Sequence, residues 1–158
     1  MVSQSVDLVI LRHGEAEPYI NSDAERELTS RGREETRAKI ALLAEQGFQP
    51  EEIIHSPFTR TTQTAGVCHE FFPDAKLRAH SGLMHSAQPE MVPLIWGESN
   101  SVLLASHMPL VARLLLYLCP TANVYGFNVS GYARVEVNRE SLESVLIHDA
   151  TGGYRGSL

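Results

Sequence analysis

The chain has 158 residues, of which 43% are hydrophobic, and it carries a formal net charge of −6 from 13 basic and 19 acidic side chains. A chain of this length buries roughly 70% of its unfolded surface, so we expect a single domain over residues 1–158. The acidic balance and the scattered Lys and Arg exclude a strongly basic face and therefore nucleic acid as the expected partner. Because no apolar stretch reaches about 18 residues and no signal-peptide pattern opens the chain, we expect a cytoplasmic protein that does not enter a membrane.

Apolar runs alternate with helical patterns along the chain. They predict strands at 6–11, 52–55, 76–80, 101–105, 132–137 and 142–147, and helices at 31–46, 58–72, 89–97 and 109–118. Such alternation predicts an α/β fold, a three-layer α/β/α sandwich with a mainly parallel central sheet. The last two strands form an antiparallel hairpin at the sheet edge. Thr29 or Ser30 is expected to cap the first helix and Gly47 to end it.

Two predicted strands are followed directly by a histidine. Arg12, His13 and Gly14 come after the first strand, and His107 comes after the strand at 101–105. In open α/β sheets ligands bind outside the carboxyl ends of the strands, so both rings are expected to face a binding crevice. Gly14 would let the backbone approach a ligand closely.

A third junction follows the strand at 52–55. Ser56 suits the cap of the next helix, and Pro57 suits its first turn. Arg60 would then lie about one turn into the helix, where it can share an anion with the helix N-terminus. The three junctions therefore bring two histidines and two arginines to one edge of the sheet.

Four ordered motifs carry a family resemblance. They are Leu11–Gly14, Arg26–Gly32, Ser56–Thr64 and Ser106–Val111. In these motifs the chain resembles the histidine phosphatases of the phosphoglycerate-mutase-like superfamily, and most of all the short bacterial protein phosphohistidine phosphatases of the SixA type. The resemblance implies a phosphoglycerate mutase-like fold and a hydrolase that needs no metal or other cofactor.

The same resemblance implies roles for the four residues at the sheet edge. His13 would be the nucleophile that becomes phosphorylated, and water would hydrolyse the phosphohistidine. Arg12, Arg60 and His107 would hold the phosphoryl oxygens, with His107 cationic during transfer. Elementary chemistry agrees, because arginine forks bind phosphate bidentately and a neutral imidazole is a competent nucleophile.

A metal site is the rival interpretation of the clustered histidines. His13 and His107, together with His55 or His85, would approach the three ligands of a catalytic zinc site. Arg12 adjoins His13, however, and a second arginine is expected nearby. Two guanidinium groups repel a dication, so we expect no metal.

The segment 81–88 contains neither Asp nor Glu, whereas larger members of the superfamily carry an acidic proton donor after the third strand. An alkoxide leaving group needs such an acid. Imidazole, with an ordinary pKa of about 6.5, leaves with little help. The segment therefore favours phosphohistidine as the substrate. His85 is a candidate proton donor and substrate contact, and Glu15 and Glu17 are alternative donors.

The connection between Gly14 and Thr29 is short, and the chain offers no long segment to cover the crevice. An open crevice admits a phosphorylated protein, and the resemblance implies a histidine-containing phosphotransfer domain or a phosphocarrier protein. Inorganic phosphate or a related oxyanion should occupy the same pocket, and Ser22 is assigned as a further contact. Two alternatives stay open, a phosphatase for small phosphate monoesters and a catalytically silent phosphate-binding protein.

Overall fold

A mixed six-stranded sheet forms the centre of the molecule in the computed structural model, which describes residues 1–18 and 21–153. The strand order is β3-β2-β4-β1-β5-β6. The first four strands in this order run parallel, and β5 and β6 are antiparallel, which confirms the predicted parallel sheet with an antiparallel edge. The strands are β1 (Ser5–Arg12), β2 (Glu52–His55), β3 (Lys76–Ala79), β4 (Ser101–Ser106), β5 (Tyr132–Asn138) and β6 (Ser144–Ala150).

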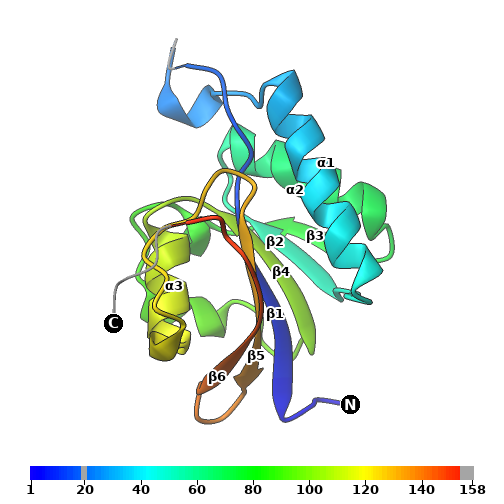
Figure 1. Ribbon diagram of the computed structural model, residues 1–158, viewed down its shortest axis with the longest axis vertical. Helices are drawn as coiled ribbons and strands as arrows, with labels where there is room; N and C mark the ends of the chain where they lie inside the picture. Colours follow the sequence, from blue (N-terminus) through cyan, green and yellow to red (C-terminus); the bar gives the residue numbers. More distant parts are fainter. Residues whose placement is uncertain (19–20, 154–158) are drawn as a thin grey trace.

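Helices cover both faces of this sheet (Figure 1). The helices α1 (Ser30–Glu45) and α2 (Thr59–Phe71) lie on one face, and α3 (Leu110–Leu118) lies on the other. The predicted three-layer α/β/α sandwich is therefore confirmed. Four short 3-10 helices connect these elements: η1 (Asp23–Glu25), η2 (Ser81–Leu83), η3 (Pro89–Leu94) and η4 (Pro120–Ala122).

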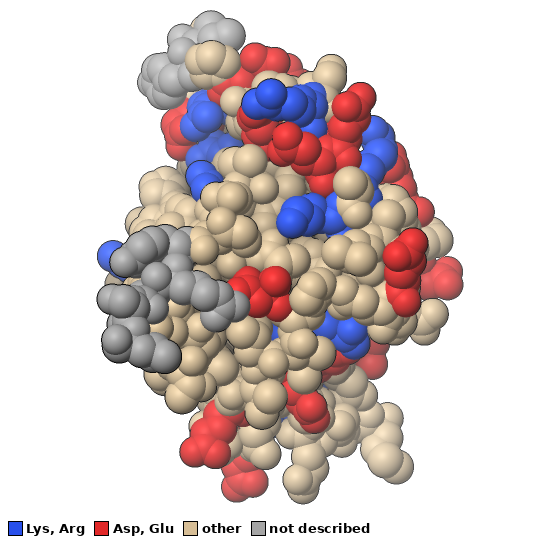
Figure 2. All heavy atoms as spheres, in the orientation of Figure 1, with Lys and Arg blue, Asp and Glu red and all other residues tan. Residues whose placement is uncertain are grey.

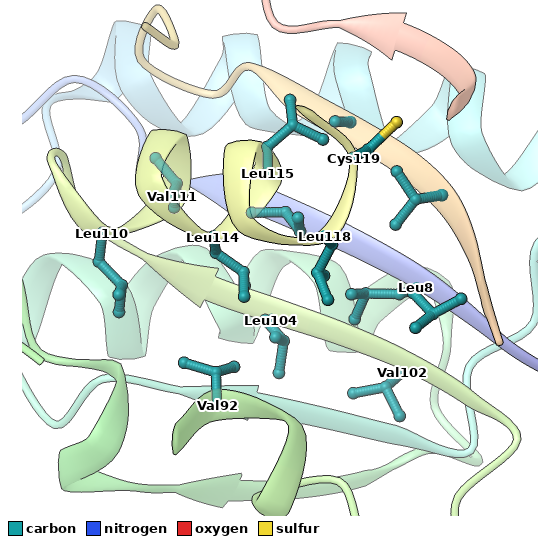
Figure 3. Packing of buried hydrophobic residues seen from close by; sticks show 14 of the residues in the cluster. Leu8, Val92, Val102, Leu104, Leu110, Val111, Leu114, Leu115, Leu118 and Cys119 are labelled. Atoms are coloured by element: carbon teal, nitrogen blue, oxygen red, sulfur yellow. The ribbon is translucent and has the colours of Figure 1, made fainter. Parts of the chain in front are cut away.

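Successive side chains of the central strands point to opposite faces of the sheet, so the hydrophobic core consists of two clusters. Leu8 and Ile10 of β1 pack in the cluster on the α3 side, whereas Val9 and Leu11 pack in the cluster with α1 and α2. Figure 3 shows Leu114 and Leu118 of α3 near Leu104 of β4. Each fully buried side chain of this kind contributes roughly 1.5–3 kcal/mol, so the strand ends that carry the functional residues are firmly held.

Two predicted boundaries are wrong. The segment expected as a helix at 89–97 is only the 3-10 helix η3, because Pro93 lies inside it and cannot donate a helical hydrogen bond. The last strand spans Ser144–Ala150 rather than 142–147. Leu142 has a φ of 64° and closes the turn, donating its backbone N–H to the carbonyl of Asn138 over 2.8 Å.

The two cysteines, Cys68 and Cys119, are buried and unbridged, and a free cysteine in such surroundings behaves as a small hydrophobic residue. Among the helices of the described residues, none has the length and apolar character that a membrane crossing requires.

Candidate active site

The strands β1, β4 and β2 end at the same level of the sheet, and a candidate functional residue follows each of them. Arg12 of β1 pairs with Ser106 of β4, and Ala105 of β4 pairs with His55 of β2. Main-chain hydrogen bonds continue past the strand ends, since the His13 N–H donates to the carbonyl of Ser106 over 3.0 Å. The parallel register thus sets His13, His107 and the residue after His55 next to one another.

Gly14 packs closely against α1. A Cβ on Gly14 would lie 2.8 Å from Thr36 Oγ1 and 2.9 Å from the Gly32 carbonyl oxygen. The N–H of Gly14 donates to Thr64 Oγ1 of α2 over 3.1 Å. The turn after His13 is therefore clamped between two helices, which limits the freedom of the histidine.

The ring of His13 is held in one tautomer. Its Nδ1 lies 2.7 Å from the carbonyl oxygen of Gly14, which only accepts, so Nδ1 carries the proton. Its Nε2 accepts from Arg60 Nε over 3.3 Å. Burial, followed by the charges of Arg60 and Arg12, lowers the pKa of His13 to about 4 although the Gly14 bond opposes the shift. The imidazole is neutral near pH 7, with the Nε2 lone pair directed at Arg60.

The start of α2 differs from the prediction. The helix begins at Thr59, so Ser56 is not its cap and Pro57 precedes the first turn. The Ser56 hydroxyl instead lies 2.8 Å from His107 Nε2. Arg60 is the second residue of the helix and only 5% exposed, which places its guanidinium against His13.

His107 is 1% exposed, and its Nδ1 has no hydrogen-bond partner among the described residues. Burial and then the charge of Arg60 lower the pKa of His107 to about 3, so the ring is neutral in this structure. A phosphoryl dianion placed beside it would raise that pKa. The expected cationic His107 therefore depends on a bound anion.

Arg12 is held by the segment that precedes β5. Its Nη1 donates to the carbonyl of Phe127 over 2.7 Å, whereas its buried Nε is unpaired within the described part of the chain. Ser130, which has a φ of 59°, donates its backbone N–H to the carbonyl of His13 over 3.0 Å. The segment before β5 thus positions both Arg12 and His13.

One cavity of about 360 Å³ collects the predicted residues. Its lining includes Arg12, His13, Arg60, His107 and His85. The His85 ring stands edge-on to that of His107, with centroids 5.8 Å apart, and its buried Nδ1 finds no partner in the described residues. These unpaired nitrogens on cavity residues are suited to an oxyanion.

Ser22 lies elsewhere. It lines a neighbouring hollow with Glu17, so the structure does not bring either residue to the histidines. His55 is buried, with Nδ1 lying 2.8 Å from the carbonyl oxygen of Ser56, and is not among the residues that line the cavity. Glu15 does line the cavity, but its two carboxylate oxygens hold Thr29 and Arg31 at the start of α1.

Asp23 and Arg26, on and beside η1, line the same cavity and were not predicted as site residues. Asp23 accepts from Arg60 Nη2 over 3.2 Å and from Arg26 Nη1 over 3.1 Å. They lie in the connection 15–29, whose lack of periodicity gave no reason to select them. The spacing of three residues between an acid and an arginine, typical of a helical turn, is the signal that could have found them.

Charges around the site are mixed. On the face presented in Figure 2, the Lys and Arg side chains near the start of α1 lie among Asp and Glu side chains. Arg31 illustrates the pattern, since it contacts both Glu15 and Glu35. No group of three potential metal ligands occurs within residues 1–18 and 21–153.

Comparison with known proteins identifies a family and several similar structures. Residues 8–86 match the family model described as the histidine phosphatase superfamily (branch 1). Phosphohistidine phosphatase SixA of Escherichia coli K12 is 31% identical over 146 residues, which cover 84% of this chain and 86% of that protein. The solved structure of the protein histidine phosphatase SixA complexed with tungstate superposes with a TM-score of 0.85 at 28% identity, covering 92% of this chain and 97% of the other. Phosphoglycerate mutase from Plasmodium falciparum shares the fold, with a TM-score of 0.69 at 15% identity over 98% of this chain and 96% of that one.

Proposed function

Because the chain belongs to the histidine phosphatase superfamily, we propose that it is a phosphohistidine phosphatase that works through a covalent intermediate on His13. One observation carries the assignment of roles. His13 is neutral with an unprotonated Nε2 that accepts only from Arg60 within the described residues, in a cavity where buried nitrogens of Arg12 and His107 are unpaired within the described chain. A nucleophile and donors for a phosphoryl group are thus present together.

In the first step His13 Nε2 attacks the phosphorus atom of the substrate. A bond forms between Nε2 and phosphorus, the bond from phosphorus to the substrate imidazole breaks, and its electron pair stays on the leaving nitrogen. The carbonyl of Gly14 accepts from the Nδ1 proton of His13, which stabilises the positive ring that results.

In the second step water attacks the phosphorus atom of phosphorylated His13. The bond from phosphorus to Nε2 breaks and its electron pair returns to the ring. The proton that the attacking water gives up passes to a phosphoryl oxygen, and inorganic phosphate leaves. Arg12, Arg60 and His107 stabilise the three phosphoryl oxygens in both steps, because charge collects there in the transition state.

We assign His85 to contact with the leaving group. Its place in the lining of the cavity and its edge-on contact with the His107 ring support this assignment. Ser22, in the adjacent hollow, stays a predicted contact for the phosphorylated partner. We further propose that the partner is a histidine-containing phosphotransfer domain or a phosphocarrier protein in the cytoplasm, and that residues 1–158 act as one catalytic domain without a metal.

Trapping the intermediate tests this function. The protein is mixed with a phosphohistidine-bearing phosphotransfer domain, quenched without acid and digested for mass spectrometry. Phosphate on His13, absent from His13→Ala and present in the control His69→Ala on the far part of α2, is the expected result. Phosphate on another residue would overturn the role of His13. Faster turnover of small phosphate monoesters than of the phosphoprotein would replace the substrate class with metabolites.

A further inference from the structure

One edge of the Arg60 guanidinium is shared between His13 and Asp23. Arg60 Nε donates to His13 Nε2 over 3.3 Å, and Nη2 donates to Asp23 Oδ2 over 3.2 Å. The N–H groups of Nε and Nη2 point in parallel, as the two prongs of the fork that binds two oxygens of a phosphate. The Asp23 carboxylate therefore lies directly beside the position that the phosphoryl group takes up in front of His13.

Asp23 lies on the solvent side of that position. His13 and Arg60 are 7% and 5% exposed, whereas the side chain of Asp23 is 44% exposed. In an in-line displacement the leaving group departs on the side opposite the nucleophile. Because His13 is buried, we expect the leaving imidazole to depart toward the exposed side of the cavity, and Asp23 is a lining residue with an exposed side chain.

Transfer from phosphohistidine to His13 is nearly symmetric, since an imidazole is both nucleophile and leaving group. The nucleophile keeps its second nitrogen protonated through the Gly14 carbonyl. The leaving imidazole departs as a neutral molecule only if its own second nitrogen is protonated, and this N–H needs an acceptor in the cavity.

We propose that the Asp23 carboxylate accepts the N–H of the phosphorylated substrate imidazole and so selects a substrate whose ring is protonated and departs as neutral imidazole. The proposal rests on the proposed function and specifies which residue recognises the leaving group. When the bond to phosphorus breaks, the electron pair goes to the leaving nitrogen, the proton stays on the other nitrogen, and neutral imidazole is released.

Asp23 fits this role better than its neighbours. Both lining carboxylates accept hydrogen bonds on both oxygens. Glu15 is bound to Thr29 and Arg31 at the start of α1, whereas Asp23 is bound to Arg26 and to Arg60, the arginine that contacts His13. Burial opposes ionisation of Asp23, but hydrogen bonds and charges from Arg26 and Arg60 outweigh it and hold the pKa of Asp23 below its ordinary value. An ionised carboxylate accepts an N–H, and it repels an alkoxide or phenolate leaving group.

Asp23→Asn tests the proposal, because it removes the negative charge while the amide oxygen can still accept from one of the two arginines that now bind the carboxylate. The probes are free phosphohistidine, which avoids effects on protein docking, and p-nitrophenyl phosphate, whose leaving group has no N–H. We expect kcat/KM for phosphohistidine to fall about 10- to 100-fold, the range for a hydrogen bond to a charged group. The rate with p-nitrophenyl phosphate should stay the same or rise.

The pH dependence gives a second readout. Without Asp23 the substrate imidazole is protonated only at lower pH, so the phosphohistidine rate of the variant should recover as the pH falls toward 6, relative to wild type. Glu25→Gln is the matched control, since it removes the same charge from the same turn and Glu25 is not among the residues that line the cavity. It should leave both rates unchanged.

The outcomes separate the two proposals. Equal losses on both probes would show that Asp23 only maintains the loop, and equal gains would show that it only competes with phosphate for Arg60. Either result overturns this inference. Failure of the wild-type protein to hydrolyse phosphohistidine at all would instead overturn the proposed function.

Discussion

Replacing His13 with asparagine should make folding less sensitive to acid. The pKa of His13 is lowered from 6.5 to about 4 in the folded protein, chiefly by burial. Between these values the unfolded chain binds more protons than the folded one, so stability is lost as the pH falls through this window. At 1.36 kcal/mol per pKa unit, lowering the pH from about 7.5 to about 5 costs roughly 2 kcal/mol through this residue.

Urea unfolding at the two pH values, followed by circular dichroism, measures this cost. We expect the wild type to lose about 2 kcal/mol more unfolding free energy on acidification than His13→Asn. His69→Asn removes a histidine outside the cavity and is the control, with a loss like that of the wild type. Equal losses in all three proteins would refute the conclusion that the fold holds His13 neutral.

Three further predictions concern the site and its support. Arg60→Ala should lower kcat/KM by ~10²–10³, the cost of one preorganised donor, and Arg60→Lys should recover little because an ammonium lacks the parallel fork; a variant within threefold of wild type would remove Arg60 from the site. A chelator should leave turnover unchanged while tungstate inhibits competitively with substrate, and activity lost in chelator but restored by zinc would favour the metal alternative. Gly32→Ala should destabilise the fold by about 1–3 kcal/mol, since its Cβ would meet the Glu15 backbone, and an unchanged urea midpoint would contradict that packing.

The ends of the buried strands were predicted to within one residue, because burial determines where their apolar runs stop. β1, β2 and β4 are buried nearly throughout, so their apolar runs end where the chain leaves the core, at Arg12, His55 and Ser106. The parallel register then aligns the following residues, and the cluster of His13, His107 and the two arginines follows from that alignment. The apolar runs do not specify the order of the strands, because that order depends on packing between segments far apart in the chain.

The features that the sequence did not reveal depend on short-range geometry. Ser56 and Pro57 suit a helix start, yet the hydroxyl of Ser56 contacts His107 and the helix begins later. Asp23 belongs to a three-residue 3-10 turn, too short for any hydrophobic period to appear. Gly14 was correctly singled out, but the close neighbour is α1, which no local pattern can show.

The placement of the hairpin between β5 and β6 has a consequence for how this fold can be altered. β5 runs antiparallel to β1, so Tyr132 lies beside Leu11 near the site while Asn138 lies beside Ser5 at the other end of the sheet. Extra sequence inserted at the hairpin turn is therefore remote from the chemistry. The same insertion between Phe127 and Ser130 would release the main-chain groups that hold Arg12 and His13. Fusion partners and reporter tags belong at the hairpin, where enlargement of the protein leaves its reactive end unchanged.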